Sequence, residues 1–227
     1  MAPVRPGGEL ATRPLHFIWI VDCSGSMGGD KIKSLNFAIN EALPTMRKVA
    51  DENPNANILV RAVKFSDGAQ WHVAQPTPIE SFRWMDLSAD GVSDLGKALK
   101  LVAEQLKMPP MEERALPPVL VLLSDGQPTD DFSSGLKELM GQPWGQKSVR
   151  IAIAIGGDAH PDILQKFIGN PEIKPLQANN SESLVKYIKW ASTVVLKSAS
   201  SPKGTDEESK GAIPIPTPPP PSGDDVW

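Results

Sequence analysis

Three short apolar runs, each followed by turn residues, constrain the fold of this chain most. They are LHFIWIV (15–21), PPVLVLLSDG (117–126) and SVRIAIAIG (148–156). Each run is too short for an ordinary helix, and none alternates between apolar and polar positions. Such runs are typical of strands that are buried on both faces, as in a parallel sheet covered by helices.

Amphipathic helical patterns separate these strands. They fall in DKIKSLNFAINEAL (30–43), SDLGKALKLVAEQLK (93–107) and SESLVKYIKWASTVVLK (181–197). A strand over 57–65 runs through the turn SDG into AQWHVA, which indicates one hairpin and therefore one antiparallel edge strand. The order of elements predicts an α/β fold, doubly wound around a mostly parallel central sheet with helices on both faces.

Composition divides the chain into three parts. We expect a flexible N-terminus at 1–13, one domain at 14–197 and a disordered, proline-rich, acidic tail at 198–227. The formal net charge is −4, with no basic stripe, which argues against a nucleic-acid partner. The single cysteine, the lack of a signal-peptide pattern and the lack of a membrane-spanning stretch lead us to expect a cytoplasmic protein with no membrane partner.

Oxygen donors follow the ends of two of the predicted strands. The first strand ends at Asp22, and the serines Ser24 and Ser26 follow in the turn; the strand at 117–124 ends at Asp125. In an open α/β sheet, ligands bind beyond the carboxyl ends of the strands, where the strand order reverses. If the two strands are neighbours, the carboxylates converge, and a loop could add the hydroxyl of Ser93.

This donor set contains only hard oxygens. Two carboxylates and three hydroxyls suit Mg²⁺, or else Mn²⁺ or Ca²⁺, whereas the lack of Cys and His argues against zinc. Two aspartates neutralise a divalent ion but leave coordination positions open. Water could fill them, and a carboxylate from another protein could displace that water.

The motifs DCSGSM, VSDLGKAL and LLSDGQPTDD together resemble the von Willebrand factor A (VWA) domain and its metal-ion-dependent adhesion site (MIDAS). The resemblance covers about 14–197 and implies a metal site made of five oxygen donors: Asp22, Ser24, Ser26, Ser93 and Asp125. Ser93 stands where the family usually has Thr, and Gly96 favours Ser93 over the adjacent Asp94. In the family the hydroxyls bind the metal directly, and the aspartates often act through water.

Within the family, the chain is most similar to bacterial TerY-type proteins associated with tellurium resistance, through RPLHFIWIVDCSGSM, VKFSDGAQWHV and SDGQPTDDF. That resemblance implies a scaffold without enzymatic activity in a stress response. It also implies partners that include a Ser/Thr protein kinase and a protein phosphatase. A Glu or Asp of a partner would complete the metal's coordination.

Other functions are open at this point. Asp22 could serve a metal-dependent phosphohydrolase, or the chain could be a metal-free scaffold that binds through an edge strand or its tail. His160 and Asp158 suggest a third hypothesis, a hydrolase in which Ser24 or Ser26 is the nucleophile and Asp158 orients His160. The sequence contains no Gly-x-Ser-x-Gly nucleophile elbow, which argues against it.

Four apolar residues are candidates for a partner surface. Phe82, Trp84 and Met85 precede Ser93 and either form exposed anchors near the metal or cover the core. Trp227 ends the proline-rich tail and favours a recognition role for it.

Overall fold

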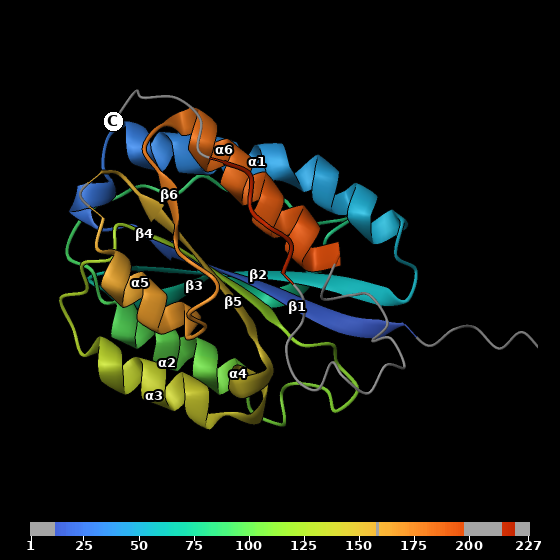
Figure 1. Ribbon diagram of the computed structural model, residues 1–227. Coiled ribbons are helices and arrows are strands. Elements are labelled where there is room, and N and C mark those ends of the chain that lie inside the picture. The colour runs from blue at the N-terminus through green and yellow to red at the C-terminus, as the bar shows by residue number, and fades with distance from the viewer. Residues whose placement is uncertain (1–11, 158, 198–214, 221–227) are drawn as a thin grey trace, which may run out of the picture.

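The computed structural model describes residues 12–157, 159–197 and 215–220. These residues form a six-stranded sheet in the order β3-β2-β1-β4-β5-β6, in which only the β2–β3 pair is antiparallel. The predicted fold class is therefore confirmed (Figure 1). The strands are β1 (Arg13–Asp22), β2 (Ala56–Ser66), β3 (Gly68–Pro78), β4 (Val119–Ser124), β5 (Val149–Ile155) and β6 (Leu176–Ala178).

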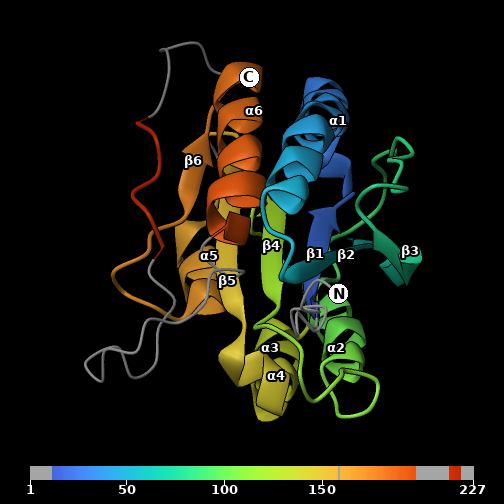
Figure 2. The ribbon, with the colours of Figure 1, turned by 90° about the vertical axis from the view of Figure 1, so that its right-hand side faces the viewer.

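Helices cover both faces of this sheet. One face carries α1 and α6, and the other carries α2 to α5 (Figures 1 and 2). The helices are α1 (Asp30–Asp51), α2 (Leu95–Gln105), α3 (Phe132–Gly141), α4 (Pro143–Lys147), α5 (Pro161–Ile168) and α6 (Ser181–Trp190). A short 3₁₀ turn (Gly25–Met27) follows β1, and a π-helical turn (Ala191–Val195) follows α6.

Strand β1 shows why the apolar runs had no alternation. Phe17, Trp19 and Val21 pack into the core under α1 and α6, whereas Ile18 and Ile20 pack into the core under α2 to α5. All five are at most 1% exposed. Because successive side chains point to opposite faces, a strand covered on both sides must be apolar at every position.

Most of the tail predicted over 198–227 lies outside the described residues, so the prediction of disorder there stays a prediction. The described residues of the tail, 215–220, lie against the body, and Ile215 packs on the core beneath α6. A groove between β6 and α6 accepts this apolar side chain. No helix in the described ranges combines the length and the hydrophobicity needed to cross a membrane.

Candidate metal centre

The candidate site lies where β1 and β4 end side by side. These strands pair in parallel, with Val21 opposite Leu123, so Asp22 and Ser124 end the two strands at the same edge of the sheet. Strand β1 pairs with β2 on its other side, which makes this edge the point where strand order reverses. The topology therefore brings Asp22 and Asp125 to the place where α/β folds bind ligands.

Asp22 is fully buried and accepts hydrogen bonds at both carboxylate oxygens. Its Oδ1 accepts from the backbone N–H of Ser24 at 2.9 Å and from the Ser24 hydroxyl at 2.6 Å. Its Oδ2 accepts from the hydroxyls of Ser124 at 2.6 Å and Ser93 at 3.3 Å. The Ser26 hydroxyl lies 3.1 Å from that of Ser24. The predicted hydroxyl donors Ser24, Ser26 and Ser93 thus cluster around Asp22.

Asp125 is the second buried carboxylate and is only 2% exposed. Burial raises the pKa of Asp22 above its ordinary value; hydrogen bonds from Ser124 and Ser24 oppose the rise, and the charge of Asp125 adds to it. Within the described ranges, neither aspartate forms an ion pair with Lys, Arg or His. Two neighbouring buried charges without a cation are costly, so this pair fits a bound divalent ion.

The composition of the site also fits a hard cation. Among the described residues, no group of three or more His, Cys, Asp or Glu side chains could hold a metal ion, so a cation here would depend on hydroxyl oxygens in addition to the two aspartates. The donors near Asp22 are carboxylate and hydroxyl oxygens instead. Oxygen ligands of this kind suit Mg²⁺ better than zinc.

The loop that carries Ser93 is tied to the loop after β4. The backbone N–H of Ser93 donates to Thr129 Oγ1 at 3.1 Å, and the N–H of Thr129 donates back to the Ser93 carbonyl at 2.8 Å. The adjacent Asp94 is engaged elsewhere, since its Oδ2 accepts from the Gly68 N–H and from Lys97, each at 2.7 Å. The hydrogen bond from Lys97 holds the pKa of Asp94 below its ordinary value. This geometry favours Ser93 over Asp94 as a ligand.

Two residues of this network were missed from the sequence. Ser124 binds Asp22 directly, and Thr129 fixes the position of Ser93. A signal existed for Ser124, because a serine that ends a fully apolar strand next to an aspartate must find a partner. No comparable signal marks Thr129, whose contact depends on how two distant loops meet.

The aromatic candidates for a partner surface lie in the core. Phe82 and Trp84 are 1% and 7% exposed, and the Trp84 indole donates to Asn36 Oδ1 at 3.0 Å. Both residues therefore cover the core, which was the second of the two interpretations. The structure corrects the expectation that they are exposed anchors. Met85 is 64% exposed and stays a candidate contact. Trp227 lies outside the described residues.

The groups that suggested other chemistry do not assemble in the described part of the chain. No hydrogen bond there joins the His160 side chain to Ser24 or Ser26; His160 is the N-cap of α5, and Asp158 lies outside the described residues. Burial, aided by the charge of Asp22, raises the pKa of the Cys23 thiol to about 12. Cys23 is therefore a small buried residue and not a reactive thiolate.

Comparisons with known proteins agree with this fold. A family model described as the von Willebrand factor type A domain matches residues 18–189. A search of curated proteins found no match. Among solved structures, the ArnB paralog VWA2 from Sulfolobus acidocaldarius is 19% identical with a TM-score of 0.58, over 79% of this chain and 45% of that one.

Two further solved structures are similar at the same level. The von Willebrand factor type A protein from Catenulispora acidiphila is 19% identical with a TM-score of 0.58, over 80% of this chain and 42% of that one. The pilus adhesin SpaC from Lactobacillus rhamnosus GG is 14% identical with a TM-score of 0.59, over 80% of this chain and 30% of that one. This chain spans less than half the length of these relatives, and such identities show a shared fold.

Proposed function

Because this chain belongs to the von Willebrand factor type A domain family, we propose that it is a metal-dependent protein-binding module without enzymatic activity of its own. Asp22, Ser24, Ser26, Ser93 and Asp125 would hold Mg²⁺, and a Glu or Asp of a partner would complete the site. The observation that carries this proposal is the buried Asp22–Asp125 pair, which has hydroxyl groups around it and, among the residues that the structure describes, no cationic side chain paired with it.

Each residue of the site has a distinct task in this proposal. When bound, Mg²⁺ would offer an open coordination position to an incoming carboxylate. Ser124 and the backbone N–H of Ser24 hold the Asp22 carboxylate in one orientation. Thr129 holds the loop of Ser93, so that its hydroxyl stays beside Asp22. The site is therefore built before any partner arrives, which lowers the entropic cost of binding.

The resemblance to TerY-type proteins suggests a cellular setting for this module. In that setting it would be a scaffold in a bacterial stress response linked to tellurium resistance. A Ser/Thr protein kinase and a protein phosphatase are the partner classes that the resemblance implies. The solved relative SpaC is named a pilus adhesin, a name consistent with a binding role for this fold.

The test is a pull-down from lysate of the source cells with wild-type protein and Asp22→Ala, each with Mg²⁺ or with EDTA. We expect specific partners only with wild type and Mg²⁺. Asp51→Ala is a matched control, because Asp51 is exposed at the far end of α1, and it should behave as wild type. Identical partners in all four arms would show that adhesion through the metal is wrong.

The alternative, a phosphohydrolase that uses Asp22, is tested on the same proteins. Both oxygens of Asp22 already accept two hydrogen bonds each, which lowers the reactivity of a carboxylate as a nucleophile. We therefore expect no turnover of p-nitrophenyl phosphate with Mg²⁺. Turnover that disappears in Asp22→Asn would favour the enzyme over the binding module.

A further inference from the structure

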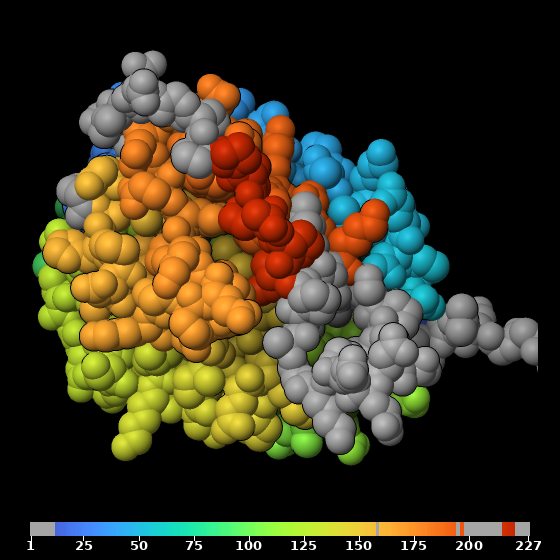
Figure 3. All heavy atoms as spheres, in the orientation of Figure 1, coloured from blue at the N-terminus to red at the C-terminus, as the bar shows by residue number. Residues whose placement is uncertain are grey.

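Part of the proline-rich tail lies in a groove on the far side of the domain's core from α2. Residues 215–220 cross the surface between β6 and α6 (Figure 3). A cavity of about 270 Å³ lies along the first half of this segment. The sheet, helix α6 and the tail all contribute to its walls. The lining residues include Ile151 of β5, Leu176 of β6, Trp190 of α6 and Ile215 of the tail.

Two contacts hold the segment, one apolar and one polar. Ile215 packs against the buried residues beneath α6 and is partly buried there. At the other end of the segment, Lys186 of α6 donates from Nζ to the backbone carbonyl of Pro220 at 2.7 Å. The groove thus contacts one apolar side chain, that of Ile215, and one main-chain carbonyl, that of Pro220 five residues further on.

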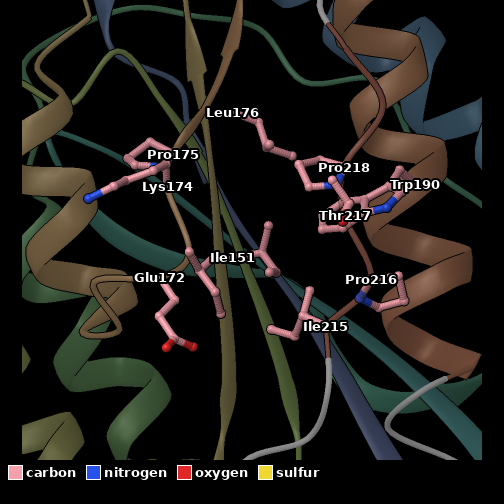
Figure 4. Close-up of a pocket in the computed structure, with 11 residues that line it drawn as sticks. Ile151, Glu172, Lys174, Pro175, Leu176, Trp190, Ile215, Pro216, Thr217 and Pro218 are labelled. Carbon is pink, nitrogen blue, oxygen red and sulfur yellow. The ribbon is translucent and has the colours of Figure 1, made fainter.

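Trp190 forms the wall of the groove beside the tail. In Figure 4 its ring lies next to Thr217 and Pro218, and Leu176 points toward Pro218. Trp190 is 7% exposed, and its Nε1–H has no hydrogen-bond partner in the described structure. A buried donor without an acceptor is unfavourable, so the docking of the tail on Trp190 leaves this cost uncompensated.

The chemistry of the segment matches a groove of this kind. Four of the residues in 215–220 are prolines and have no N–H, so the segment cannot extend the sheet beyond β6. Proline also fixes φ, so an extended proline-rich chain loses little entropy when it docks. Grooves lined by aromatic side chains recognise such chains through their carbonyls and apolar faces.

We propose that the groove between β6 and α6 is a recognition site for extended proline-rich segments, and that residues 215–220 are its intramolecular occupant. The tail is then a tethered ligand that leaves and returns. The unpaired indole and the remaining cavity show that its fit is incomplete, so a segment in trans competes with it. This site is separate from the metal centre, and its occupancy does not depend on Mg²⁺.

The tether determines how large the competition should be. A ligand on a short flexible linker has an effective concentration on the order of 1 mM. If the free segment binds with a Kd of about 100 μM, the tethered copy weakens binding in trans by roughly tenfold. Removing the tethered copy from the groove should therefore strengthen binding in trans by the same factor.

The experiment measures fluorescence anisotropy of a labelled synthetic peptide of residues 211–222 titrated with full-length protein. Ile215→Asp places a charge where the tail meets the core and frees the groove, and the change lies outside the folded body. We expect this variant to bind the peptide about tenfold more tightly than wild type, with and without EDTA. The matched control is Met108→Asp, which places the same charge on an apolar side chain that is 54% exposed and lies outside the groove, and it should behave as wild type.

Two further arms locate the site. A peptide that itself carries Ile215→Asp should not bind any of the proteins. A benzoylphenylalanine at the position of Thr217 in the peptide should cross-link to α6 or β6 of the Ile215→Asp protein. Equal affinity of wild type and Ile215→Asp, no binding to either, or cross-links only outside α6 and β6 would each overturn the proposal.

Discussion

The Ser124 hydroxyl donates a 2.6 Å hydrogen bond to Asp22 Oδ2 and so joins the ends of β4 and β1. Ser124 Oγ in turn accepts from the N–H of Gly126 at 2.8 Å. Ser124 is fully buried, so water cannot replace either bond. One side chain therefore fixes both the orientation of Asp22 and the turn that leads from Asp125.

We first predict that Ser124→Ala lowers the free energy of unfolding by about 1–3 kcal/mol, because it removes the shorter of the two hydrogen bonds to Asp22 Oδ2 and leaves the buried N–H of Gly126 without its partner. Urea unfolding of the two proteins in EDTA measures this. Ser81→Ala is the control, since that hydroxyl donates to the Pro78 carbonyl at an exposed position, where water can replace the bond, and its loss should cost less. Equal stability of Ser124→Ala and wild type would contradict the structural role of Ser124.

The second prediction concerns the response of stability to metal. Mg²⁺ at 100 times its Kd should raise the free energy of unfolding by about 2.7 kcal/mol in wild type and leave Asp125→Asn unchanged. In EDTA, Asp125→Asn should be at least as stable as wild type, because the repulsion between Asp125 and Asp22 is gone. Thermal unfolding with and without Mg²⁺ measures both effects.

The exposed Asp51→Asn serves as the charge-matched control and should show the full response to Mg²⁺. A similar rise in the free energy of unfolding of Asp125→Asn would show that the metal binds elsewhere. No rise in wild type would show that the proposed function does not involve the metal.

Much of the fold could be predicted because its signals are local. Runs without alternation identified the strands buried on both faces, and turn residues marked where each strand ends. The first strand, expected over 15–21, extends over Arg13–Asp22, and the hairpin lies at the edge of the sheet as expected. Because parallel strands end at a common edge, the placement of Asp22 beside the end of β4 also followed from the pattern, whereas the pattern gave the Ser93 hydroxyl only as a donor that a loop could add.

What could not be predicted depends on contacts between distant segments. Phe82 and Trp84 precede Ser93 in an irregular stretch, and only the packing of that stretch on α1 buries them. The bond between Ser93 and Thr129 joins two loops 36 residues apart. The composition of the tail indicates disorder, but it cannot show that Ile215 has a groove to enter.

A third prediction concerns the glycine contact between α2 and α3. A Cβ at Gly135 would lie 2.3 Å from the carbonyl oxygen of Gly96, which is backbone and cannot move away cheaply. Gly135→Ala should therefore destabilise the fold by about 1–3 kcal/mol, although alanine is normally the better helix former. It should also weaken binding of Mg²⁺, because α2 follows directly after the loop that carries Ser93.

Urea unfolding and Mg²⁺ titration calorimetry measure the two effects of Gly135→Ala. Gly141→Ala in the same helix is the control, since a Cβ there meets nothing within 4 Å. That change should be neutral or stabilise by up to about 1 kcal/mol. If Gly135→Ala behaves like Gly141→Ala, the two helices are not packed as closely as the structure shows.

The fourth prediction concerns pH and the pair formed by His16 and Glu112. His16 is buried at 4% exposure, and its Nε2 lies 3.0 Å from Glu112 Oε2. Burial, the largest single effect, raises the pKa of Glu112, but the hydrogen bond from His16, a backbone hydrogen bond and the charge of His16 together hold the pKa below its ordinary value. A carboxyl of this kind stabilises the fold above its unfolded pKa, and that stabilisation is lost as the pH falls through its folded pKa.

Wild type should therefore be more stable than Glu112→Gln near pH 7, by less than about 1 kcal/mol because the Glu112 side chain is half exposed. The difference should vanish as the pH falls from about 6 to about 3, since the carboxylate is then protonated in both states. Urea unfolding at several pH values measures this, and the exposed neighbour Glu113→Gln should show no such trend. A difference that persists at pH 3 would mean that Glu112 stabilises the domain through packing, and that its charge contributes nothing.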